Sequence, residues 1–475
     1  MMEFEPVTMI AYSVMLLLTI GLAWVVTVLF AKNEGDEDAK KKSTEGDGKG
    51  QQPGGGKKNK GNKQNVEKPV GTKGKNKPRS RTTSEADSEN HPWTVATFKG
   101  HAGLITDMSW SSNDKFIASC AQDRTVLIWF AKDLLTKDRR SIRVNVPFDN
   151  ARNIAWSPDC TAFIVALEDQ KVLEVYKLGK KAEGSHVTVN SLTKFKKVHD
   201  EDIIGIGIAC TGLFIMSCSN DGNMILWDVK GSVLERMSIP VGVTATCAKV
   251  SHCGRYVAVC GNDCILVEVI FNEMKQFKSI RTFGKLQGHE SRVEHVDFNA
   301  DSSRIVTVTE NGVWRLYDTT GNRINVVCMG QAKSVPIAGN DFFPTVSLSP
   351  DGRIVAVGHT NEIDIFEVTL GSPTTNIKPK FTLANIGVRK IVFSSDGKYI
   401  LGAGEKSIQV FHNICGHLAT FNDLARQMNE SSAHSSLKSR LSTEMANILQ
   451  DLTKLNVGES IETTLQEMRE IINHC

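Results

Sequence analysis

The sequence predicts an all-β fold, a seven-bladed β-propeller, with a transmembrane helix before it and a short α-helical tail after it. A polar turn that precedes an apolar strand recurs at spacings of 45, 52, 42, 48, 50 and 45 residues. The turns end at Lys115, Cys160, Gly212, Gly254, Ser302, Gly352 and Gly397. About four short strand-like runs and no helical pattern separate consecutive turns. A period in the forties with four strands per repeat is typical of a propeller, in which each repeat forms one twisted sheet.

The composition limits the classes of protein. The chain has 475 residues, of which 40% are hydrophobic and 23% are charged, so it can bury one large repeat domain. The net charge of +3 excludes an overall electrostatic preference for nucleic acid or for a membrane surface. Eleven cysteines occur without a C-x-x-C pair, and several fall in strand-like runs. This usage indicates a reducing compartment rather than disulfides or a metal site.

The pattern of residues 1–31 predicts a membrane-spanning segment that also serves as a signal anchor. No charged residue occurs from Pro6 to Ala31, and this run is long enough to cross roughly 30 Å of hydrocarbon. Glu3, Glu5 and the length of the run argue against a cleaved signal peptide. Lysines follow the span and none precede it: Lys32, Lys40, Lys41 and Lys42. The downstream body is therefore expected in the cytosol.

Residues 32–92 form a Lys-rich segment with almost no apolar residues, which we expect to be a disordered tether. From Lys49 to Arg81 there are eleven basic residues and one acid, Glu67. Candidate contacts to phosphate or lipid are Lys57, Lys58, Lys60, Lys63, Lys73, Lys75, Lys77, Arg79 and Arg81. The tether is a solvated spacer, a contact for anionic lipid, or a non-specific contact for RNA phosphates. It lacks aromatic residues, so base stacking is not expected.

Residues 93–413 are assigned to the propeller, and three blades share a set of polar residues. A histidine, a hydroxyl, a turn residue and an aromatic residue recur at matching spacing in blades one, three and five. The sets are His101, Ser119, Asp123 and Trp129; His199, Ser217, Asp221 and Trp227; and His289, Thr307, Asn311 and Tyr317. A buried carboxylate needs a donor, so we expect each histidine to bond the turn residue and the hydroxyl, and the hydroxyl to bond the aromatic residue. At the position of the tryptophan the other blades carry Tyr176, Val267, Phe366 and Phe411.

A serine, a histidine and an aspartate in one cluster also suggest a hydrolase. The serines lack a G-x-S-x-G elbow, and the same set occurs in several blades. Repetition indicates a structural need rather than one active site. We therefore expect no enzymatic activity, no cofactor and no metal.

Residues 414–475 change to a helical period. Apolar residues recur at helical spacing at Leu441, Met445, Ile448, Leu452 and Leu455, and again at Ile461, Leu465, Met468 and Ile472. The pattern predicts two or three amphipathic helices. They either pack on the rim of the propeller or form a short coiled coil with a partner or a second copy.

The GH and WD ends of the repeats and the aspartate between them resemble the WD40 family, whose blades contain such hydrogen-bonded tetrads. The runs CAQDRTVLIW, AWSPDCTAFIV and GEKSIQVFHN, with the order of anchor, tether, propeller and tail, are similar to membrane-anchored members of that family. This resemblance implies a single-pass protein of the endoplasmic reticulum with a cytosolic propeller. It also implies association with the stress-activated translation-factor kinase of the unfolded-protein response, and links to messenger RNA.

Two functions from different classes remain. The first is a membrane-tethered scaffold that binds proteins through the propeller faces. The second is an RNA- or ribosome-associated translation factor that uses the basic tether. A ubiquitin-ligase substrate receptor is a weaker third, because Trp227-Asp228 is followed by Val229-Lys230 and lacks the expected arginine.

Overall fold

The computed structural model describes residues 91–180, 187–321, 324–333, 343–368, 374–384, 387–430, 435–455 and 459–473. The predicted span at 1–31 and the tether, apart from its last two residues, lie outside the described residues. Among the helices that the structure describes, none is both long enough and apolar enough to cross a bilayer.

Seven sheets form the blades, each with four antiparallel strands, and the first four blades follow the chain in simple order. Blade one contains β2 (Ile105–Trp110), β3 (Phe116–Ala121), β4 (Thr125–Phe130) and β5 (Ser141–Asn145), with a 3-10 turn at Ala131–Asp133. Blade two contains β6 (Ala151–Trp156), β7 (Ala162–Leu167), β8 (Leu173–Lys180) and β9 (Val187–Lys194). Blade three contains β10 (Ile203–Ile208), β11 (Ile215–Ser219), β12 (Asn223–Trp227) and β13 (Val233–Ser238). Blade four contains β14 (Cys247–Val250), β15 (Tyr256–Cys260), β16 (Cys264–Phe271) and β17 (Phe277–Leu286).

Blades five and six are less regular, because a segment between two strands of blade six joins the sheet of blade five. Blade five contains β18 (Val293–Phe298), β19 (Arg304–Thr309), β20 (Val313–Asp318) and β21 (Asn325–Gln331). Blade six contains β22 (Thr345–Leu348), β23 (Ile354–His359), β24 (Glu362–Glu367) and β26 (Phe381–Ala384). Between β24 and β26 the chain forms β25 (Thr374–Ile377), which pairs in parallel with the outer edge of β21 and gives blade five a fifth strand.

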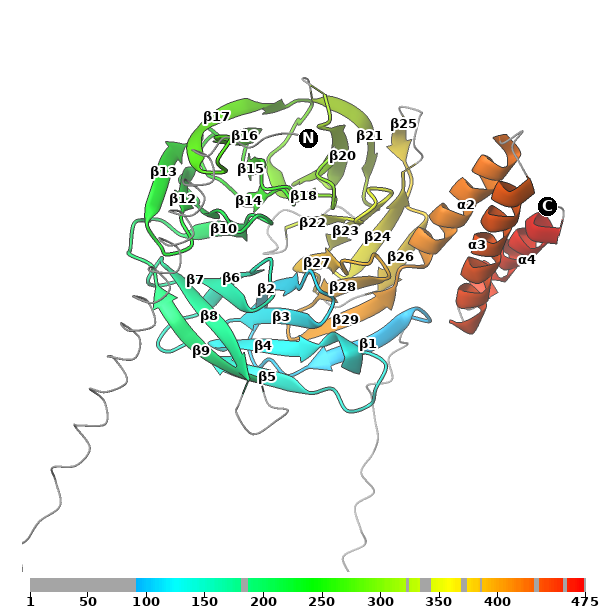
Figure 1. Cartoon of the computed structure of the whole chain (residues 1–475), viewed down its shortest axis with the longest axis horizontal. Helices are drawn as coiled ribbons and strands as arrows, with labels where there is room; N and C mark the ends of the chain where they lie inside the picture. The colour runs from blue at the N-terminus through cyan, green and yellow to red at the C-terminus, as the bar shows by residue number, and fades with distance from the viewer. Residues whose placement is uncertain are drawn as a thin grey trace, which may run out of the picture. The chain divides into compact units, whose positions relative to one another are not determined.

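Blade seven closes the ring by combining the two ends of the propeller. It contains β27 (Lys390–Phe393), β28 (Tyr399–Ala403) and β29 (Ser407–His412), and its outermost strand is β1 (Thr94–Lys99). Phe98 of β1 lies opposite Ile408 of β29 in the antiparallel register. The innermost strand of each blade contacts that of the next, and β27 contacts β2 (Figure 1). The fold class predicted for this part of the chain, a seven-bladed all-β propeller, is confirmed.

The seven recurrent turns share a backbone conformation. Each contains one residue with positive φ, from 53° to 72°: Asp114, Cys160, Gly212, Gly254, Ser302, Gly352 and Gly397. Glycine accepts this left-handed region without steric cost, which explains its use in four of the turns. In the first turn the equivalent position is Asp114, one residue before the Lys115 expected from the sequence.

The core lies between the blades. The five-residue strands β11 and β15 are buried along their whole length, because each packs on both neighbouring blades. Blades three and four approach so closely that a Cβ on Gly205 would lie 2.3 Å from the Ala248 carbonyl oxygen. Glycine at this position is therefore required by the contact between β10 and β14.

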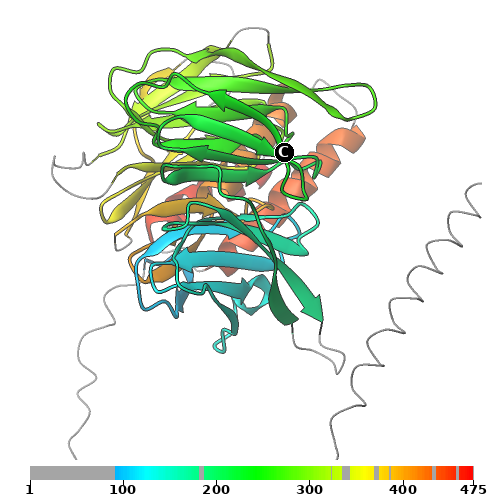
Figure 2. The ribbon, with the colours of Figure 1, turned by 90° about the vertical axis from the view of Figure 1, so that its left-hand side faces the viewer.

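Three helices follow the last blade: α2 (Ile414–Glu430), α3 (Ser435–Lys454) and α4 (Glu459–Asn473). Leu441, Met445 and Leu465 are buried in one apolar cluster with Phe421 and with Ile365 of blade six. An ion pair of 2.7 Å joins Arg353 Nη1 to Asp423 Oδ2 on α2. The helices thus form a bundle beside blade six (Figure 1), which lies behind the propeller in the view of Figure 2, and the apolar faces that could have formed a coiled coil are buried inside it.

Candidate functional site

Blade one brings its four predicted polar residues together. His101 Nδ1 lies 3.2 Å from Asp123 Oδ2, and His101 Nε2 lies 2.8 Å from Ser119 Oγ. The Trp129 indole N–H donates to the same Oγ over 3.1 Å. One proton arrangement satisfies all contacts: the indole donates to serine, serine donates to Nε2, and Nδ1–H donates to the carboxylate. Burial alone would raise the pKa of Asp123, but hydrogen bonds from Thr125, the Ala102 amide and His101 outweigh it and lower the pKa.

Blade three forms the same chain with one additional member. His199 Nε2 lies 2.7 Å from Ser217 Oγ, which accepts the Trp227 N–H over 2.8 Å. His199 Nδ1 lies 2.9 Å from Ser219 Oγ, and Ser219 donates to Asp221 Oδ1 over 2.6 Å. The expected direct contact of His199 with Asp221 is thus replaced by a contact through Ser219.

The cause of this difference is one residue. Ser219 lies opposite Ile203 in the β10–β11 register, and the equivalent position of blade one, opposite Ile105, is Ala121. Alanine has no hydroxyl, so Asp123 reaches its histidine directly. The sequence contains the signal, because SCSND in blade three stands where blade one has SCAQD.

Blade five holds only part of the expected set. His289 Nε2 lies 2.9 Å from Thr307 Oγ1 and 3.1 Å from the Tyr317 hydroxyl. Tyr317 donates its proton to the Gln287 carbonyl oxygen over 2.8 Å. The expected bond from His289 to Asn311 is replaced, since the Asn311 side-chain oxygen accepts from Thr309 over 2.6 Å.

These sets are built for structure and not for catalysis. Ser119 and Ser217 have no exposed surface, so a substrate carbonyl cannot reach either hydroxyl. Burial lowers the pKa of His199 to about 4, and burial together with the nearby Arg315 lowers that of His289 to about 4. The histidines are therefore neutral at pH 7, as the hydrogen-bond arrangement requires.

In the other four blades apolar or aromatic residues stand in the register of the tryptophan. Phe163 lies opposite Tyr176 and stacks on it at 5.3 Å, with an interplanar angle of 8°. Phe366 packs on Trp314 of blade five at 5.0 Å. At this position these four blades thus rely on apolar or aromatic packing in place of the bond from an indole to a hydroxyl.

Sequence reasoning missed an ionic network among the innermost strands. Lys390 Nζ on β27 lies 3.2 Å from Asp107 Oδ1 on β2 and 3.1 Å from His295 Nε2 on β18. Asp297 pairs with Lys249 of β14 and accepts from the Leu348 amide. Burial would raise the pKa of Asp297, but Lys249 and the hydrogen bonds outweigh it and lower the pKa. The network joins blades one, four, five, six and seven, and no periodic signal in the sequence marks it.

One group of side chains among the described residues has a composition suited to a metal. His359, Glu362 and Asp364 place ligand atoms within 4.8 Å of one another on the β23–β24 hairpin. Asp364 already accepts from Thr382 over 2.7 Å and from the Lys333 amide over 2.8 Å, and it lies 3.1 Å from His359 Nε2. The lone pairs of the Asp364 carboxylate are thus already used by hydrogen bonds within the protein. The basic residues predicted to contact phosphate or lipid, from Lys57 to Arg81, lie outside the described residues.

Comparison with known proteins agrees with this geometry. The model of the family described as "WD domain, G-beta repeat" matches residues 93–129, 190–228 and 277–318. These matches contain the histidine sets of blades one, three and five. Fold and site together define the class of the protein, a WD40-repeat β-propeller.

Two curated relatives show to which family within the WD40-repeat class the chain belongs. Transducin beta-like protein 2 of Mus musculus is 31% identical over 408 residues, which cover 83% of this chain and 89% of that protein. The protein of the same name from Homo sapiens is 32% identical over 371 residues, covering 77% and 81%. A guanine nucleotide-binding protein subunit beta from Zea mays is 23% identical over 328 residues, covering 66% and 82%. The chain belongs to the transducin beta-like protein 2 family.

The hydroxyl of Ser217 should be a main determinant of stability in blade three. Ser217→Ala removes the acceptor of Trp227 and the donor to His199, so we expect a loss of about 1–3 kcal/mol in the free energy of unfolding. The matched control is Ser238→Ala, in the exposed outer strand of the same blade. Equal urea midpoints for the two variants would contradict the role assigned to Ser217.

Acid should destabilise the propeller through its buried histidines. An unfolded histidine titrates near pH 6.5, whereas folded His199 titrates near 4, so between these values the unfolded state binds a proton that the folded state does not. The contribution of each such histidine to the free energy of unfolding is fully present above pH 6.5. It is lost as the pH drops toward 4, by up to about 1.4 kcal/mol per pH unit. Urea unfolding at several pH values should show that the free energy of unfolding depends less steeply on pH in His199→Gln than in the unaltered protein. An unchanged dependence of the free energy of unfolding on pH would contradict the neutral state assigned to buried His199.

Proposed function

We propose that the protein is a membrane-tethered scaffold whose propeller binds other proteins. Its anchor is the apolar segment at 1–31, its location is the membrane of the endoplasmic reticulum, and its propeller faces the cytosol. The partner implied by the resemblance to membrane-anchored WD40 proteins is the stress-activated translation-factor kinase of the unfolded-protein response. The basic tether would hold the propeller clear of the bilayer and contact anionic headgroups.

The observation that carries this proposal is a set of exposed apolar side chains on one face. Phe148 is 89% exposed between β5 and β6, Val243 is 86% exposed between β13 and β14, and Phe343 is 53% exposed just before β22. Each lies in a segment that runs from the outermost strand of one blade to the innermost strand of the next. Strands within a blade are antiparallel, so all such segments emerge on the same face of the ring. These side chains lie on different blades of one rigid face, where exposed apolar groups can serve as separate contacts for another protein.

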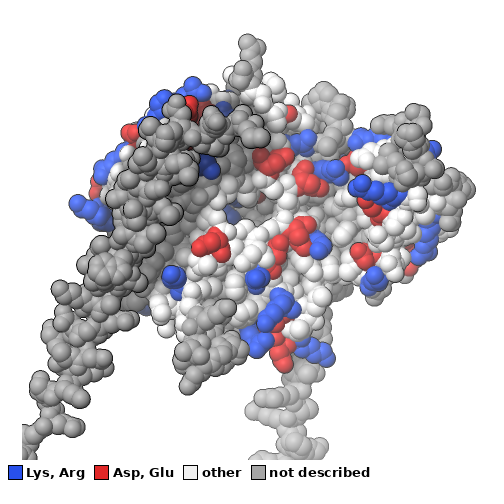
Figure 3. Space-filling model, viewed as in Figure 1, with Lys and Arg blue, Asp and Glu red and all other residues white. Residues whose placement is uncertain are grey.

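The alternative, an RNA- or ribosome-associated factor, depends on the tether alone. In the view of Figure 3, basic and acidic side chains of the described residues are interspersed, and neither sign covers the face. Binding to a phosphate backbone would favour a continuous basic surface. The face seen in this view therefore offers no continuous basic surface for RNA and favours the protein scaffold.

A pair of substitutions on the apolar face tests the scaffold. We expect the full-length double variant Phe148→Asp, Val243→Asp to lose co-purification of the kinase from stressed cells while its unfolding midpoint stays unchanged, because both side chains are exposed. The matched control is Met274→Asp, since Met274 is 81% exposed between β16 and β17, on the opposite face.

Two results would contradict the proposal. One is recovery of the kinase by the double variant at the level of the unaltered protein. The other is an equal loss in the Met274→Asp control, which would place the contact elsewhere.

A further inference from the structure

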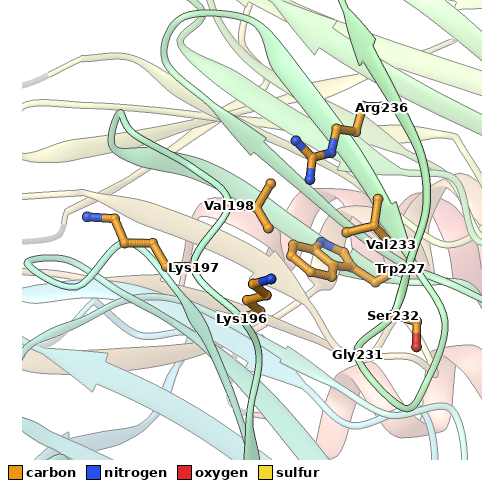
Figure 4. A pocket seen from close by; sticks show the side chains of 8 residues that line it. All are labelled: Lys196, Lys197, Val198, Trp227, Gly231, Ser232, Val233 and Arg236. Atoms are coloured by element: carbon orange, nitrogen blue, oxygen red, sulfur yellow. The ribbon is translucent and has the colours of Figure 1, made fainter.

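A second candidate surface lies at the outer side of blade three. A pocket of about 410 Å³ opens between residues 196–198, which lead from blade two into blade three, and the turn that joins β12 to β13 (Figure 4). Its volume falls in the range of about 300–1,000 Å³ that is usual for ligand sites. Trp227, Val198 and Val233 contribute apolar walls, and Ser232 contributes a hydroxyl.

The pocket concentrates positive charge. Lys196, Lys197 and Arg236 line it, and among the described residues no carboxylate forms an ion pair with any of the three. Figure 4 shows the ends of Lys196 and Arg236 on two sides of Val198 beside the Trp227 ring, with Lys197 directed away.

Nearby basic residues behave differently, because their charges are used inside the fold. Lys194 lies 3.8 Å from Glu174, and Arg152 lies 3.0 Å from Asp202. The pocket thus holds basic groups whose charge the fold leaves unpaired. An anionic ligand would supply the missing partner.

The walls of the pocket are held rigidly. The Trp227 indole is fixed by its bond to Ser217. Gly231, with φ of 89°, packs so tightly that a Cβ there would lie 2.8 Å from the Phe195 ring. Asp228 accepts from the Ser232 amide over 2.7 Å and shapes the turn. Rigid walls reduce the entropy lost on binding.

The pocket adjoins an open strand edge. Val233 and Arg236 belong to β13, the last strand in the order β10-β11-β12-β13, so its outer backbone groups are not paired within a sheet. The equivalent edge of blade five already accepts an extended segment, because β25 pairs in parallel with β21. This fold therefore tolerates strand addition at the outer edge of a blade.

We propose that the pocket and the edge of β13 together bind an extended peptide that carries a phosphorylated serine or threonine. The planar guanidinium of Arg236 suits two phosphate oxygens, and Lys196 adds charge against a group that carries nearly two negative charges. The peptide backbone pairs with β13, and Val233 contacts its apolar side chains. The pocket shares no residue with the set Phe148, Val243 and Phe343, so either proposal can fail while the other stands.

The test uses the full-length protein in detergent micelles and a library of nine-residue peptides with a fixed central phosphothreonine flanked by randomised positions. We expect retention of these peptides at least about tenfold above a matched threonine library, and loss of that preference in Arg236→Ala and Lys196→Ala, because each substitution removes a charge-assisted hydrogen bond to the phosphate. The matched control is Lys278→Ala, an exposed residue of the outer strand β17 that should retain binding. Unfolding midpoints should be equal in all variants.

Further measurements test the pairing of the peptide with β13 and distinguish phosphopeptide recognition from binding to anionic lipid. Methylation of alternate backbone nitrogens should weaken binding of a selected phosphopeptide for one set of positions and not for the other, because one edge of the peptide faces β13. Equal effects of the two sets would overturn strand pairing. Lack of preference for phosphothreonine, retention by Arg236→Ala, or binding to phosphatidylserine vesicles with no selection among phosphopeptides would overturn the proposal.

Discussion

The pairing of β1 with β29 is the constraint on which the rest of the molecule depends. A four-stranded sheet of this size cannot bury both of its faces, so every blade requires a neighbour on each side. The ring supplies those neighbours only when the first strand of the propeller completes the sheet made by the last three. The apolar face, the pocket on blade three and the docking surface for α2 all take their positions from this closure.

Within the ring, two kinds of interaction hold the blades. Blades one and three bury a serine hydroxyl that satisfies a histidine and a tryptophan, and blade five pairs its histidine with Thr307, whereas blade two stacks Phe163 on Tyr176. A buried polar chain is stable only when each member has a partner, because an orphaned group costs about 1–3 kcal/mol. Ser219 illustrates the point: its hydroxyl fills the space between His199 and Asp221 and leaves neither unpaired. The resulting rigidity suits a scaffold, because binding then orders few side chains.

Features that repeat could be predicted from the sequence, and features that occur once could not. The period of the polar turns revealed the blades, and the spacing of His199, Ser217 and Trp227 revealed the polar chain. The Lys390–Asp107–His295 network joins residues far apart in the chain, and only the closed ring brings them together. The movement of β25 to blade five and the pocket around Arg236 likewise depend on the contact of two blades. The apolar pattern of the tail predicted its helices but not that blade six would cover them.

Native-state hydrogen exchange of the full-length protein tests ring closure most directly. If β1 is an integral strand of blade seven, the backbone amides of Ala96 and Phe98 exchange as slowly as those of β28 and β11, through unfolding of the whole propeller. Exchange of the β1 amides within seconds, while β11 and β28 stay protected, would show that the ring is open at this seam and would contradict the account.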